Sequence, residues 1–288
     1  MRRLLNHFSV VRLAKYLPGP GYRALNSAIG RRRPAGQVSV AMFHFGRCGS
    51  TAVASLLRRH PSIAWDGEVF ELLREDVLSE ARLTRSPLEL IQIRRNWTRT
   101  PVYGFETKTL AEAQLRPGLV GLSLEEYVDG LRGLGFDHFI ILKRRHYLRQ
   151  IVSAHVGWKT RTWHQPRDAA ASLTPVEIDP AATRYGTQHF DLLSLFRYFD
   201  QAYEHHRRVL RGAAVATLEL MYEDDILPGP EIAYATICQF LDLPVHPGRA
   251  WTSRTNPFPL NAMVENYEEI ARLLQASEFA WMVEEELE

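Results

Sequence analysis

The fold of this chain of 288 residues is set by one stretch, VSVAMFHFGRCGST at residues 38–51. An apolar run, Val38–Phe43, leads into a turn with two glycines, and the following segment, Ala52–Arg59, has the apolar spacing of a helix. In α/β proteins, a buried strand that enters a glycine turn and then a helix binds phosphate, because backbone N–H groups and the helix dipole point toward the anion. The stretch therefore predicts an α/β fold and a site for a phosphorylated nucleotide.

The residues of this turn suit an anionic ligand. Glycines let the backbone approach a ligand closely, Arg47 adds a guanidinium fork, and Ser50 and Thr51 add hydroxyl donors. We expect the phosphate to contact Gly46, Arg47, Cys48, Gly49, Ser50 and Thr51. A turn that merely connects a strand to a helix is the alternative interpretation.

The turn differs from two common nucleotide loops. The ATP-binding P-loop reads Gly-x-x-x-x-Gly-Lys-Ser/Thr, whereas this turn is shorter and places Arg47 before its second glycine. The dinucleotide pattern Gly-x-Gly-x-x-Gly is absent as well. The short form, with Arg or Lys ahead of Gly-Ser/Thr-Thr, resembles the 5′-phosphosulfate loop of sulfotransferases that use 3′-phosphoadenosine 5′-phosphosulfate (PAPS).

A second segment extends the resemblance. Phe139–Leu142 reads as a buried strand, and the basic sequence KRRHYLRQIVS follows at residues 143–153. In sulfotransferases, an Arg at the end of this strand and a Ser on the next helix hold the 3′-phosphate of PAPS, and Arg145 and Ser153 have the family's spacing. A charged fork and a short hydroxyl donor suit a phosphate. A solvated basic helix face is the alternative.

The resemblance covers most of residues 38–275. YEDD at 222–225 and FLDL at 240–243 resemble the family's strand end and helix end. The sequence from Arg254 to Leu260 resembles a C-terminal segment of bacterial carbohydrate sulfotransferases of the trehalose and nodulation-factor type. In those enzymes it often covers the nucleotide, which implies that Arg254 also reaches the 3′-phosphate.

Two positions depart from the family pattern. Cys48 replaces a usual Ser or Thr, and His146 replaces a frequent Asn. Neither change removes a charged phosphate contact. We therefore expect them to alter affinity for PAPS more than the type of reaction.

The resemblance implies transfer of a sulfuryl group from PAPS to a hydroxyl of a carbohydrate or glycolipid. Charge then builds on the departing 5′-phosphate, and Arg47 is the expected cation there. Glu68 matches a Gly-Glu-x-Phe pattern whose Glu is the base in related enzymes. Asp66 is the competing carboxylate. The alternative for Glu68 is a residue at the start of a helix that has no catalytic role. Lys108 is expected to assist the sulfate or the acceptor, or to pair with Glu106.

The segment 159–187 has no clean periodicity and contains three prolines. A loop of this length in a compact domain is usually functional or disordered. Related enzymes carry a Trp-His or Trp-Arg pair here, which implies that Trp163 and His164 line the acceptor pocket. An incidental surface Trp is the alternative.

Short apolar runs alternate with helical patterns, which predicts a P-loop-like, three-layer α/β/α fold around a mainly parallel sheet. Strands are predicted at Val38–Phe45, Ile63–Trp65, Val102–Lys108, His138–Lys143 and Ala214–Leu220. Helices are predicted at Ser50–Arg59, Val69–Glu80, Pro87–Arg95, Leu124–Gly133, Tyr147–Trp158, Gln188–Arg211, Glu231–Leu241 and Leu260–Leu274.

Composition and length fit one domain. With 45% apolar residues, residues 35–288 can form a single α/β domain whose C-terminal helical segment covers the nucleotide. Two cysteines imply no disulfide framework, so we expect a reducing, cytoplasmic location. No His or Cys spacing suggests a metal centre, and the enzymes that this chain resembles need none.

Residues 1–34 form a basic arm with no acidic residue. Its apolar runs are too short to span a membrane. A helix packed on the domain and an amphipathic anchor at the inner membrane surface both fit the pattern of Leu4, Leu5, Phe8 and Val11. No aromatic interleaving or nucleic-acid motif accompanies the charge, so we expect no nucleic-acid partner.

Two other functions compete with sulfuryl transfer. A kinase or NTPase on the same scaffold is disfavoured by the missing loop Lys. A catalytically silent nucleotide-binding or membrane-associated scaffold is disfavoured because Arg47, Glu68, Arg145 and Ser153 together match a catalytic set.

Overall fold

The computed structural model describes residues 34–69, 87–109, 122–186 and 188–284. Its centre is a five-stranded sheet in the order β2-β3-β1-β4-β8, and every strand pair is parallel. The strands are β1 (Val38–His44), β2 (Ile63–Glu68), β3 (Val102–Lys108), β4 (His138–Lys143) and β8 (Ala216–Met221). The three-layer α/β/α fold predicted from the sequence is confirmed.

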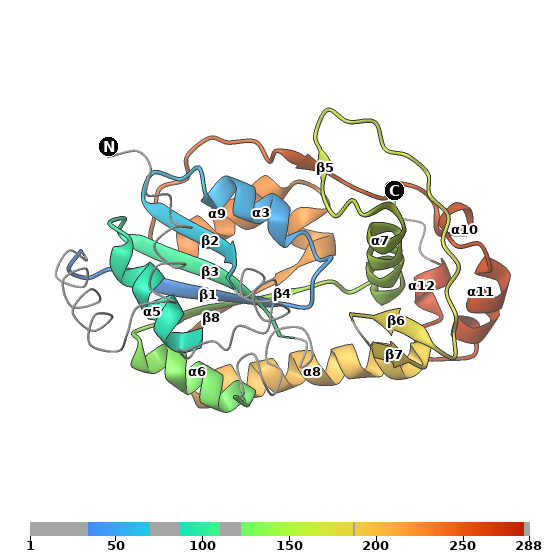
Figure 1. Ribbon diagram of the computed structural model, residues 1–288, viewed down its shortest axis with the longest axis horizontal. Coiled ribbons are helices and arrows are strands. Elements are labelled where there is room, and N and C mark those ends of the chain that lie inside the picture. The colour runs from blue at the N-terminus through green and yellow to red at the C-terminus, as the bar shows by residue number, and fades with distance from the viewer. Residues whose placement is uncertain (1–33, 70–86, 110–121, 187, 285–288) are drawn as a thin grey trace, which may run out of the picture.

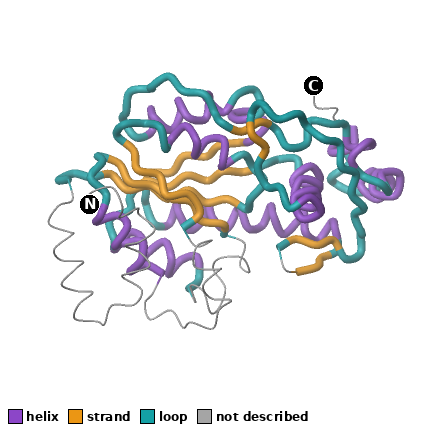
Figure 2. The backbone as a smooth tube through the Cα atoms, turned by 45° about the horizontal axis from the view of Figure 1, so that its top comes forward, coloured by secondary structure: helices purple, strands orange, loops and turns teal. Residues whose placement is uncertain are grey.

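Helices cover both faces of the sheet (Figures 1 and 2). One face carries α3 (Ser50–Leu57) and α9 (Pro230–Phe240). The other carries α5 (Pro87–Trp97), α6 (Leu124–Gly133) and the long α8 (Leu192–Gly212). Beyond the sheet lie α7 (Tyr147–Thr160) and the C-terminal helices α10 (Leu260–Met263), α11 (Tyr267–Gln275) and α12 (Trp281–Glu284).

The central strands supply two hydrophobic cores because their side chains alternate between the two faces. Met42 and Ile140 belong to the core beneath α3 and α9. Phe43 and Phe139 belong to the core beneath α6 and α8, where their rings lie 5.6 Å apart. Burial on both faces explains why these strands read as continuous apolar runs instead of alternating ones.

The strand order predicts where a ligand binds. The chain continues from β1 to β2 on one side, whereas β4 lies on the other side of β1. In open parallel sheets, ligands bind beyond the carboxyl ends of the strands, at the point where the order reverses. Here that point lies beyond β1 and β4, where the glycine turn and the basic segment begin.

The helix predicted over Gln188–Arg211 begins later, at Leu192. Residues Gln188–Phe190 instead form β7, which pairs antiparallel with β6 (Thr183–Tyr185). Asp191 then caps α8 by accepting a hydrogen bond from the Ser194 N–H at 2.9 Å. Asp191 is a favourable N-cap residue, so the helix begins directly after it. This N-cap determines the start of the helix more strongly than the helix propensity of residues 188–190.

The helix predicted over Leu260–Leu274 is two helices, α10 and α11. Between them, Val264 is extended, and the Glu265 N–H donates to the Val176 carbonyl at 2.9 Å. The Asn266 side chain binds both the N–H and the carbonyl of Ile178. The segment 159–187 thus crosses the C-terminal helices, and these backbone bonds interrupt the predicted helix.

Two predicted segments lie outside the described residues: the arm, apart from Pro34, and all but the first residue of the helix predicted at Val69–Glu80. Among the helices that the structure describes, none has the length and apolar character needed to cross a bilayer.

Candidate functional site

The glycine turn after β1 has a left-handed backbone. Gly46, Arg47 and Gly49 have φ angles of 84°, 55° and 83°. A Cβ atom at Gly49 would lie 2.8 Å from Ile226 Cγ2, so glycine is required there for space as well as for conformation. Arg47 adopts a conformation that costs a non-glycine residue free energy, and such strain is concentrated at functional sites.

The carbonyl groups of the turn are held by donors from outside it. Gln150 Nε2 donates to the Gly46 carbonyl at 2.7 Å, Arg144 Nη1 to the Arg47 carbonyl at 3.0 Å, and the Tyr185 hydroxyl to the Phe45 carbonyl at 2.6 Å. The carbonyls are therefore turned into the protein. Helix α3 begins directly after the turn, and the first N–H groups of a helix have no partner within it.

The other turn residues are placed as follows. Gly49 is the N-cap of α3, and no side chain caps that end. Ser50 is mostly buried and Thr51 is partly exposed, both in the first turn of the helix. The Cys48 side chain is fully buried in the core beneath α3. An anion at this end would meet backbone N–H groups and the positive end of the helix dipole.

Arg47 joins four segments of the chain. Its Nε and Nη2 donate to Ser153 Oγ at 2.9 and 2.7 Å, and Nη2 also donates to Thr255 Oγ1 at 3.0 Å. Its Nη1 donates to the Trp163 carbonyl at 2.7 Å. Burial and the nearby Arg144 guanidinium lower the pKa of Arg47 to about 10, which leaves the side chain charged at neutral pH.

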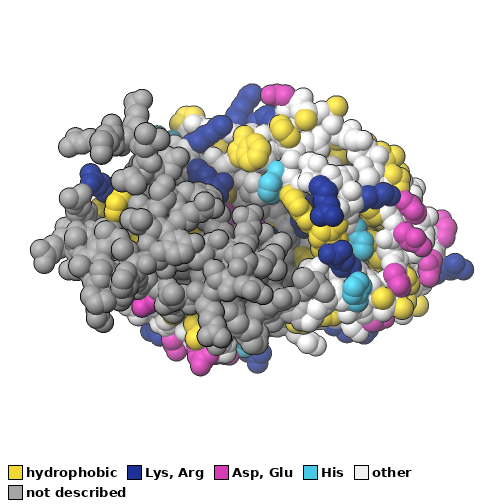
Figure 3. Space-filling model, in the orientation of Figure 1, with side chains coloured by type: hydrophobic (Ala, Val, Ile, Leu, Met, Phe, Trp, Pro, Cys, Tyr) yellow, Lys and Arg dark blue, Asp and Glu magenta, His cyan; other side chains and the backbone are white. Residues whose placement is uncertain are grey.

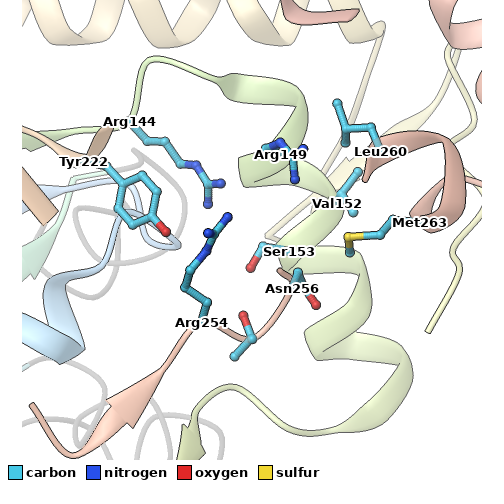
Figure 4. Close-up of a pocket in the computed structure, with 10 residues that line it drawn as sticks. Arg144, Arg149, Val152, Ser153, Tyr222, Arg254, Asn256, Leu260 and Met263 are labelled. Carbon is cyan, nitrogen blue, oxygen red and sulfur yellow. The ribbon is translucent and has the colours of Figure 1, made fainter. Parts of the chain in front are cut away.

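A pocket lies beside this guanidinium, and we call it the arginine pocket (Figure 4). Its lining contains three arginines, from the turn after β4, from α7 and from the segment after β9 (Thr252–Ser253). In Figure 4 the Arg144 and Arg254 guanidinium groups point toward each other beside the Tyr222 ring. The lining residues are Arg144, Arg149, Val152, Ser153, Tyr222, Arg254, Thr255, Asn256, Leu260 and Met263.

Several donors in the arginine pocket are buried without an acceptor. In the described part of the chain, Arg144 Nε, Arg149 Nε and Asn256 Nδ2 have no hydrogen-bond partner. Leaving a buried donor unpaired costs about 1–3 kcal/mol, and more for a charged group. Arg144 and Arg149 are only 8% and 7% exposed, so water satisfies them poorly. An anion in the pocket would offset the charges of these buried guanidinium groups.

The pKa values around the pocket report a positive potential. Burial, followed by repulsion from Arg144 and Arg254, lowers the pKa of Arg149 to about 10. Burial and the charges of Arg144 and Arg149 lower the pKa of His146 to about 3, so its imidazole is neutral. The chain thus keeps like charges close together here, an arrangement that favours an anionic ligand.

Arg145 lies outside the arginine pocket. Its side chain is 48% exposed and pairs with Asp224, with 3.2 Å between Nη2 and Oδ1. Side chains alternate between the two faces of a strand, so Arg144, two residues after Leu142, lies on the same side of the sheet as Leu142. The Leu142 side chain lies in the core beneath α3 and α9. The Arg144 guanidinium accordingly stacks over the Tyr222 ring, 4.4 Å from the centroid. The structure therefore places Arg144, and not Arg145, beside Ser153.

The YEDD sequence forms a π-helical turn, Tyr222–Ile226, that supports the pocket. The Glu223 carboxylate accepts hydrogen bonds from the N–H groups of Arg145 and His146, at 2.8 and 3.0 Å, at the N-terminus of α7. The Arg144 Nε lies 3.8 Å from the same carboxylate. Glu223 therefore holds both the N-terminus of α7 and the Arg144 guanidinium that lines the pocket.

Glu68 and Lys108 lie on the other side of the glycine turn. Lys108 Nζ is 2.5 Å from Glu68 Oε2, and the two side chains are 28% and 23% exposed. Lys108 packs against the turn. A Cβ atom added to Gly46 would lie 3.4 Å from Lys108 Cε. The structure thus brings Glu68 and Lys108, two of the three predicted catalytic side chains, to the edge of the glycine turn.

Asp66, the competing carboxylate, has a structural environment. Its Oδ2 accepts hydrogen bonds from Arg94 Nε at 2.5 Å and from the Tyr103 hydroxyl at 2.8 Å. The Arg94 guanidinium and the Tyr103 ring are both buried. A carboxylate held by two buried donors is poorly suited to accept a proton from a substrate, so Glu68 is the better candidate base.

A buried pair beneath the turn was not expected from the sequence. His44 Nε2 lies 3.3 Å from Glu106 Oε2, and Trp65 Nε1 donates to Glu106 Oε1 at 2.8 Å. Burial opposes ionisation of Glu106, but the adjacent His44 imidazole, the Trp65 N–H and the Arg58 charge outweigh it and lower the pKa to about 2. The Gly46 N–H donates to His44 Nδ1 at 3.0 Å, so the pair holds the start of the turn.

His44, Glu68 and Glu106 each offer one potential metal-ligand atom within 4.8 Å of the others. The Lys108 ammonium already lies within ion-pair distance of Glu68. The Lys108 ammonium therefore already neutralises the Glu68 carboxylate, as a bound metal ion would. These three side chains are not by themselves evidence for a metal site. The expectation of a metal-free site remains a prediction.

Trp163 and His164 lie close to the same groups. The Trp163 ring centroid is 5.7 Å from Arg47 Cζ, in addition to the hydrogen bond that its carbonyl accepts. Burial and then the Arg47 charge lower the pKa of His164, while the Glu68 carboxylate opposes this shift. The structure thus brings Trp163 and His164 close to the glycine turn.

Comparison with known proteins finds no matching family model and no matching curated protein. The function of the chain therefore has to be inferred from the geometry of its site.

Sequence reasoning missed Arg144, Arg149 and Tyr222 as pocket residues. A usable signal was present, since Arg144 and Arg149 both belong to the basic run that follows β4. Side-chain alternation along β4 would have favoured Arg144 over its neighbour. Arg149 and Tyr222 depend on how α7 and the π-helical turn pack, which no local pattern encodes.

Proposed function

We propose that this protein is a sulfotransferase that moves the sulfuryl group of PAPS to a hydroxyl of a carbohydrate or glycolipid. One observation carries the proposal: the glycine turn and the arginine pocket adjoin each other, and the Arg47–Ser153 hydrogen bonds join them. Two anion-binding features side by side suit a ligand with separated phosphate groups. PAPS has a phosphosulfate at the 5′ position and a phosphate at the 3′ position.

Each phosphate has a distinct set of donors. The 5′-phosphosulfate would occupy the N-terminus of α3, at the turn residues Gly49, Ser50 and Thr51. The 3′-phosphate would pair with the guanidinium groups of Arg144 and Arg149, next to Ser153. Arg254 also lines the pocket, which supports the proposal that it contacts the 3′-phosphate. The exposed Arg145 is not part of this set.

The arginine pocket favours this function over a kinase or NTPase. ATP has no phosphate at its 3′ position, so it would leave the positive charges of Arg144, Arg149 and Arg254 in the pocket without an anionic partner. The glycine turn also lacks the lysine with which ATP-binding loops contact the outer phosphates. A silent scaffold would need no Glu68–Lys108 pair beside the turn.

The proposed reaction needs a base, a cation and correct positioning. Glu68 accepts the proton of the acceptor hydroxyl, and that oxygen forms a bond to sulfur. The bond between sulfur and the bridging oxygen breaks, and its electron pair stays on the 5′-phosphate of the departing nucleotide. Arg47 and the N–H groups of α3 stabilise this charge. Lys108 orients Glu68 and contacts the sulfuryl oxygens.

The function is tested by incubating the full chain with PAPS and a mixture of hydroxyl acceptors. We expect adenosine 3′,5′-bisphosphate to form together with an acceptor that has gained one SO₃ group, detected by mass spectrometry. A parallel incubation with ATP and magnesium should give no phosphorylated acceptor. Phosphorylation in that arm would favour the kinase, and no turnover in either arm would favour the catalytically silent scaffold.

A lipid-linked acceptor is one form of this substrate class. The basic arm, residues 1–34, would then contact an anionic membrane surface peripherally, and the site would face a reducing, cytoplasmic compartment. Flotation of the full chain with anionic vesicles, compared with a chain that starts at residue 35, tests the contact. Equal flotation of the two would remove the membrane role of the arm.

A further inference from the structure

We propose that Gly67 is a positioning residue for the reaction, because a bulge at this glycine turns the Glu68 carboxylate, and not that of Asp66, toward the glycine turn. The inference rests on the proposed function, since it explains how the candidate base reaches its place. Sequence reasoning assigned a role to Glu68 and none to Gly67. Gly67 acts through Glu68 and contacts no substrate itself.

Strands β2 and β3 change their register before they end. Trp65 pairs with Gly104, but the next pair is Glu68 with Glu106. Two residues of β2, Asp66 and Gly67, therefore stand opposite a single residue of β3. An extra residue in one strand of a pair is a β-bulge, and bulges are over-represented beside active sites, where they re-aim a side chain.

The backbone of Gly67 makes the bulge possible. Its φ angle is 67°, in the left-handed region that glycine adopts without strain. A residue with a branched Cβ is a rare outlier in this region. A side chain at this position would therefore favour a regular strand without the bulge.

Arg58 packs against the bulge from the end of α3. Its Nε donates to the Trp65 carbonyl at 3.3 Å, and its Nη2 occupies the space that a Cβ atom on Gly67 would need. Arg58 is the exposed C-cap of α3, and Figure 3 shows Lys and Arg side chains over this part of the molecule. Because its side chain can swing into solvent, the φ angle restricts residue 67 more than space does.

The bulge places two acidic side chains on opposite faces of the sheet. In a regular strand Asp66 and Glu68 would share a face, because side chains two residues apart point the same way. Asp66 instead points toward the face covered by α5, where its carboxylate accepts hydrogen bonds from Arg94 and from the Tyr103 hydroxyl. The extra residue thus separates the structural carboxylate from the candidate base.

On the opposite face, Glu68 joins the polar group beside the glycine turn. It pairs along the strand with Glu106, whose carboxylate accepts a hydrogen bond from Trp65 Nε1 at 2.8 Å. One side-chain atom each of His44, Glu68 and Glu106 lies within 4.8 Å of the others. Lys108 Nζ is 2.5 Å from Glu68 Oε2. In a regular strand, Glu68 would point away from this group and the ion pair with Lys108 would be lost.

Two changes at residue 67 of the full chain have opposite expected results. Gly67→Val keeps the extra residue but disfavours its left-handed backbone, so Glu68 turns away, and we expect PAPS turnover to fall about 10²-fold or more at unchanged bisphosphate affinity. Deletion of Gly67 removes the extra residue, so Glu68 still pairs with Glu106 and turnover stays within about tenfold of wild type. A glycine that only stabilises the fold would make the deletion at least as harmful as the substitution.

Zero-length cross-linking measures the placement of Glu68 without any activity. A carbodiimide joins a carboxylate to an adjacent amine, and the partly exposed Glu68–Lys108 pair meets this requirement. Mass spectrometry of the digested protein should find this cross-link in wild type and in the deletion variant, but not in Gly67→Val. Gly36→Val is the matched control, because Gly36 also has a positive φ of 70° but precedes β1, at the end of that strand remote from the glycine turn. It should keep both the cross-link and the turnover.

Equal cross-linking in wild type and Gly67→Val would overturn the positioning role, and so would loss of the cross-link in a folded deletion variant. Circular dichroism establishes folding; if one variant does not fold, the cross-link in the other decides. The expected cross-link pattern without PAPS turnover by wild type would remove the proposed function and keep the placement of Glu68 by the bulge. Turnover by wild type with equal turnover by Gly67→Val would keep the function and remove the positioning role.

Discussion

The glycine turn and the arginine pocket adjoin each other, yet they are built in opposite ways. The turn is one continuous stretch, and its shape follows from the left-handed backbone at Gly46, Arg47 and Gly49. The pocket is assembled from segments far apart in the chain, which contribute Arg144 and Arg254 among other residues. Local backbone chemistry thus specifies the first site, whereas tertiary packing specifies the second.

The largest expected effect concerns the candidate base beside the turn. Glu68→Gln keeps the shape of the side chain but cannot accept a proton, so we expect turnover to fall about 10²–10⁴-fold while bisphosphate affinity stays unchanged. Turnover in the PAPS assay and calorimetry measure the two quantities.

Asp66→Asn is the matched control for Glu68→Gln. Asp66 is held by Arg94 and Tyr103, so this change should lower stability and leave the turnover of folded enzyme nearly intact. If Glu68→Gln turns over PAPS at the wild-type rate, Glu68 is not the base.

The second prediction distinguishes the roles of the neighbouring residues Arg144 and Arg145. Arg144→Ala removes a buried donor of the arginine pocket, and we expect bisphosphate to bind about 10- to 100-fold more weakly. Arg145→Ala removes an exposed ion pair with Asp224 and should change affinity less than about twofold. The opposite ranking of the two dissociation constants would show that the pocket is not the 3′-phosphate site.

These arginines illustrate what the sequence could and could not predict. The strands, most helices and the glycine turn were predictable because each depends on residues close in sequence. Family spacing points to Arg145, but the side chain beside Ser153 belongs to Arg144, which shares a face with Leu142. The His44–Glu106 pair was not predictable, because it joins two strands whose neighbourhood only the sheet order reveals.

A third prediction tests whether the shape of the turn depends on glycine at Gly49. Gly49→Ala places a methyl group 2.8 Å from Ile226 Cγ2 at a φ of 83°, so we expect a loss of about 1–3 kcal/mol in the free energy of unfolding. Chemical denaturation measures it. Gly133→Ala is the control, because a methyl group there would have open space within 4 Å and its site on α6 favours Ala. Equal stabilities of the two variants would refute the steric requirement at Gly49.

The smallest effect concerns His146 beside the pocket. Its pKa is lowered from 6.5 to about 3, so below pH 6.5 the unfolded chain binds the proton more readily than the folded one. The stability that the neutral imidazole contributes is complete above pH 6.5 and is lost progressively as the pH falls toward 3. The slope is at most about 1.4 kcal/mol per pH unit.

The control for this pH dependence is His146→Asn. Asn is a preferred N-cap residue and does not titrate, so the variant should lose less stability than wild type between pH 6.5 and pH 4. Urea denaturation across this range measures both proteins. Parallel curves would contradict a neutral His146 next to the arginines.

The most direct test of the account is calorimetric titration of the full chain with adenosine 3′,5′-bisphosphate and, separately, with 5′-AMP. The two ligands differ only in the phosphate that the arginine pocket is proposed to hold. The account predicts that the bisphosphate binds at least about tenfold more tightly, because its 3′-phosphate pairs with the guanidinium groups of Arg144 and Arg149. Equal affinities for the two ligands, or tighter binding of 5′-AMP, would contradict it.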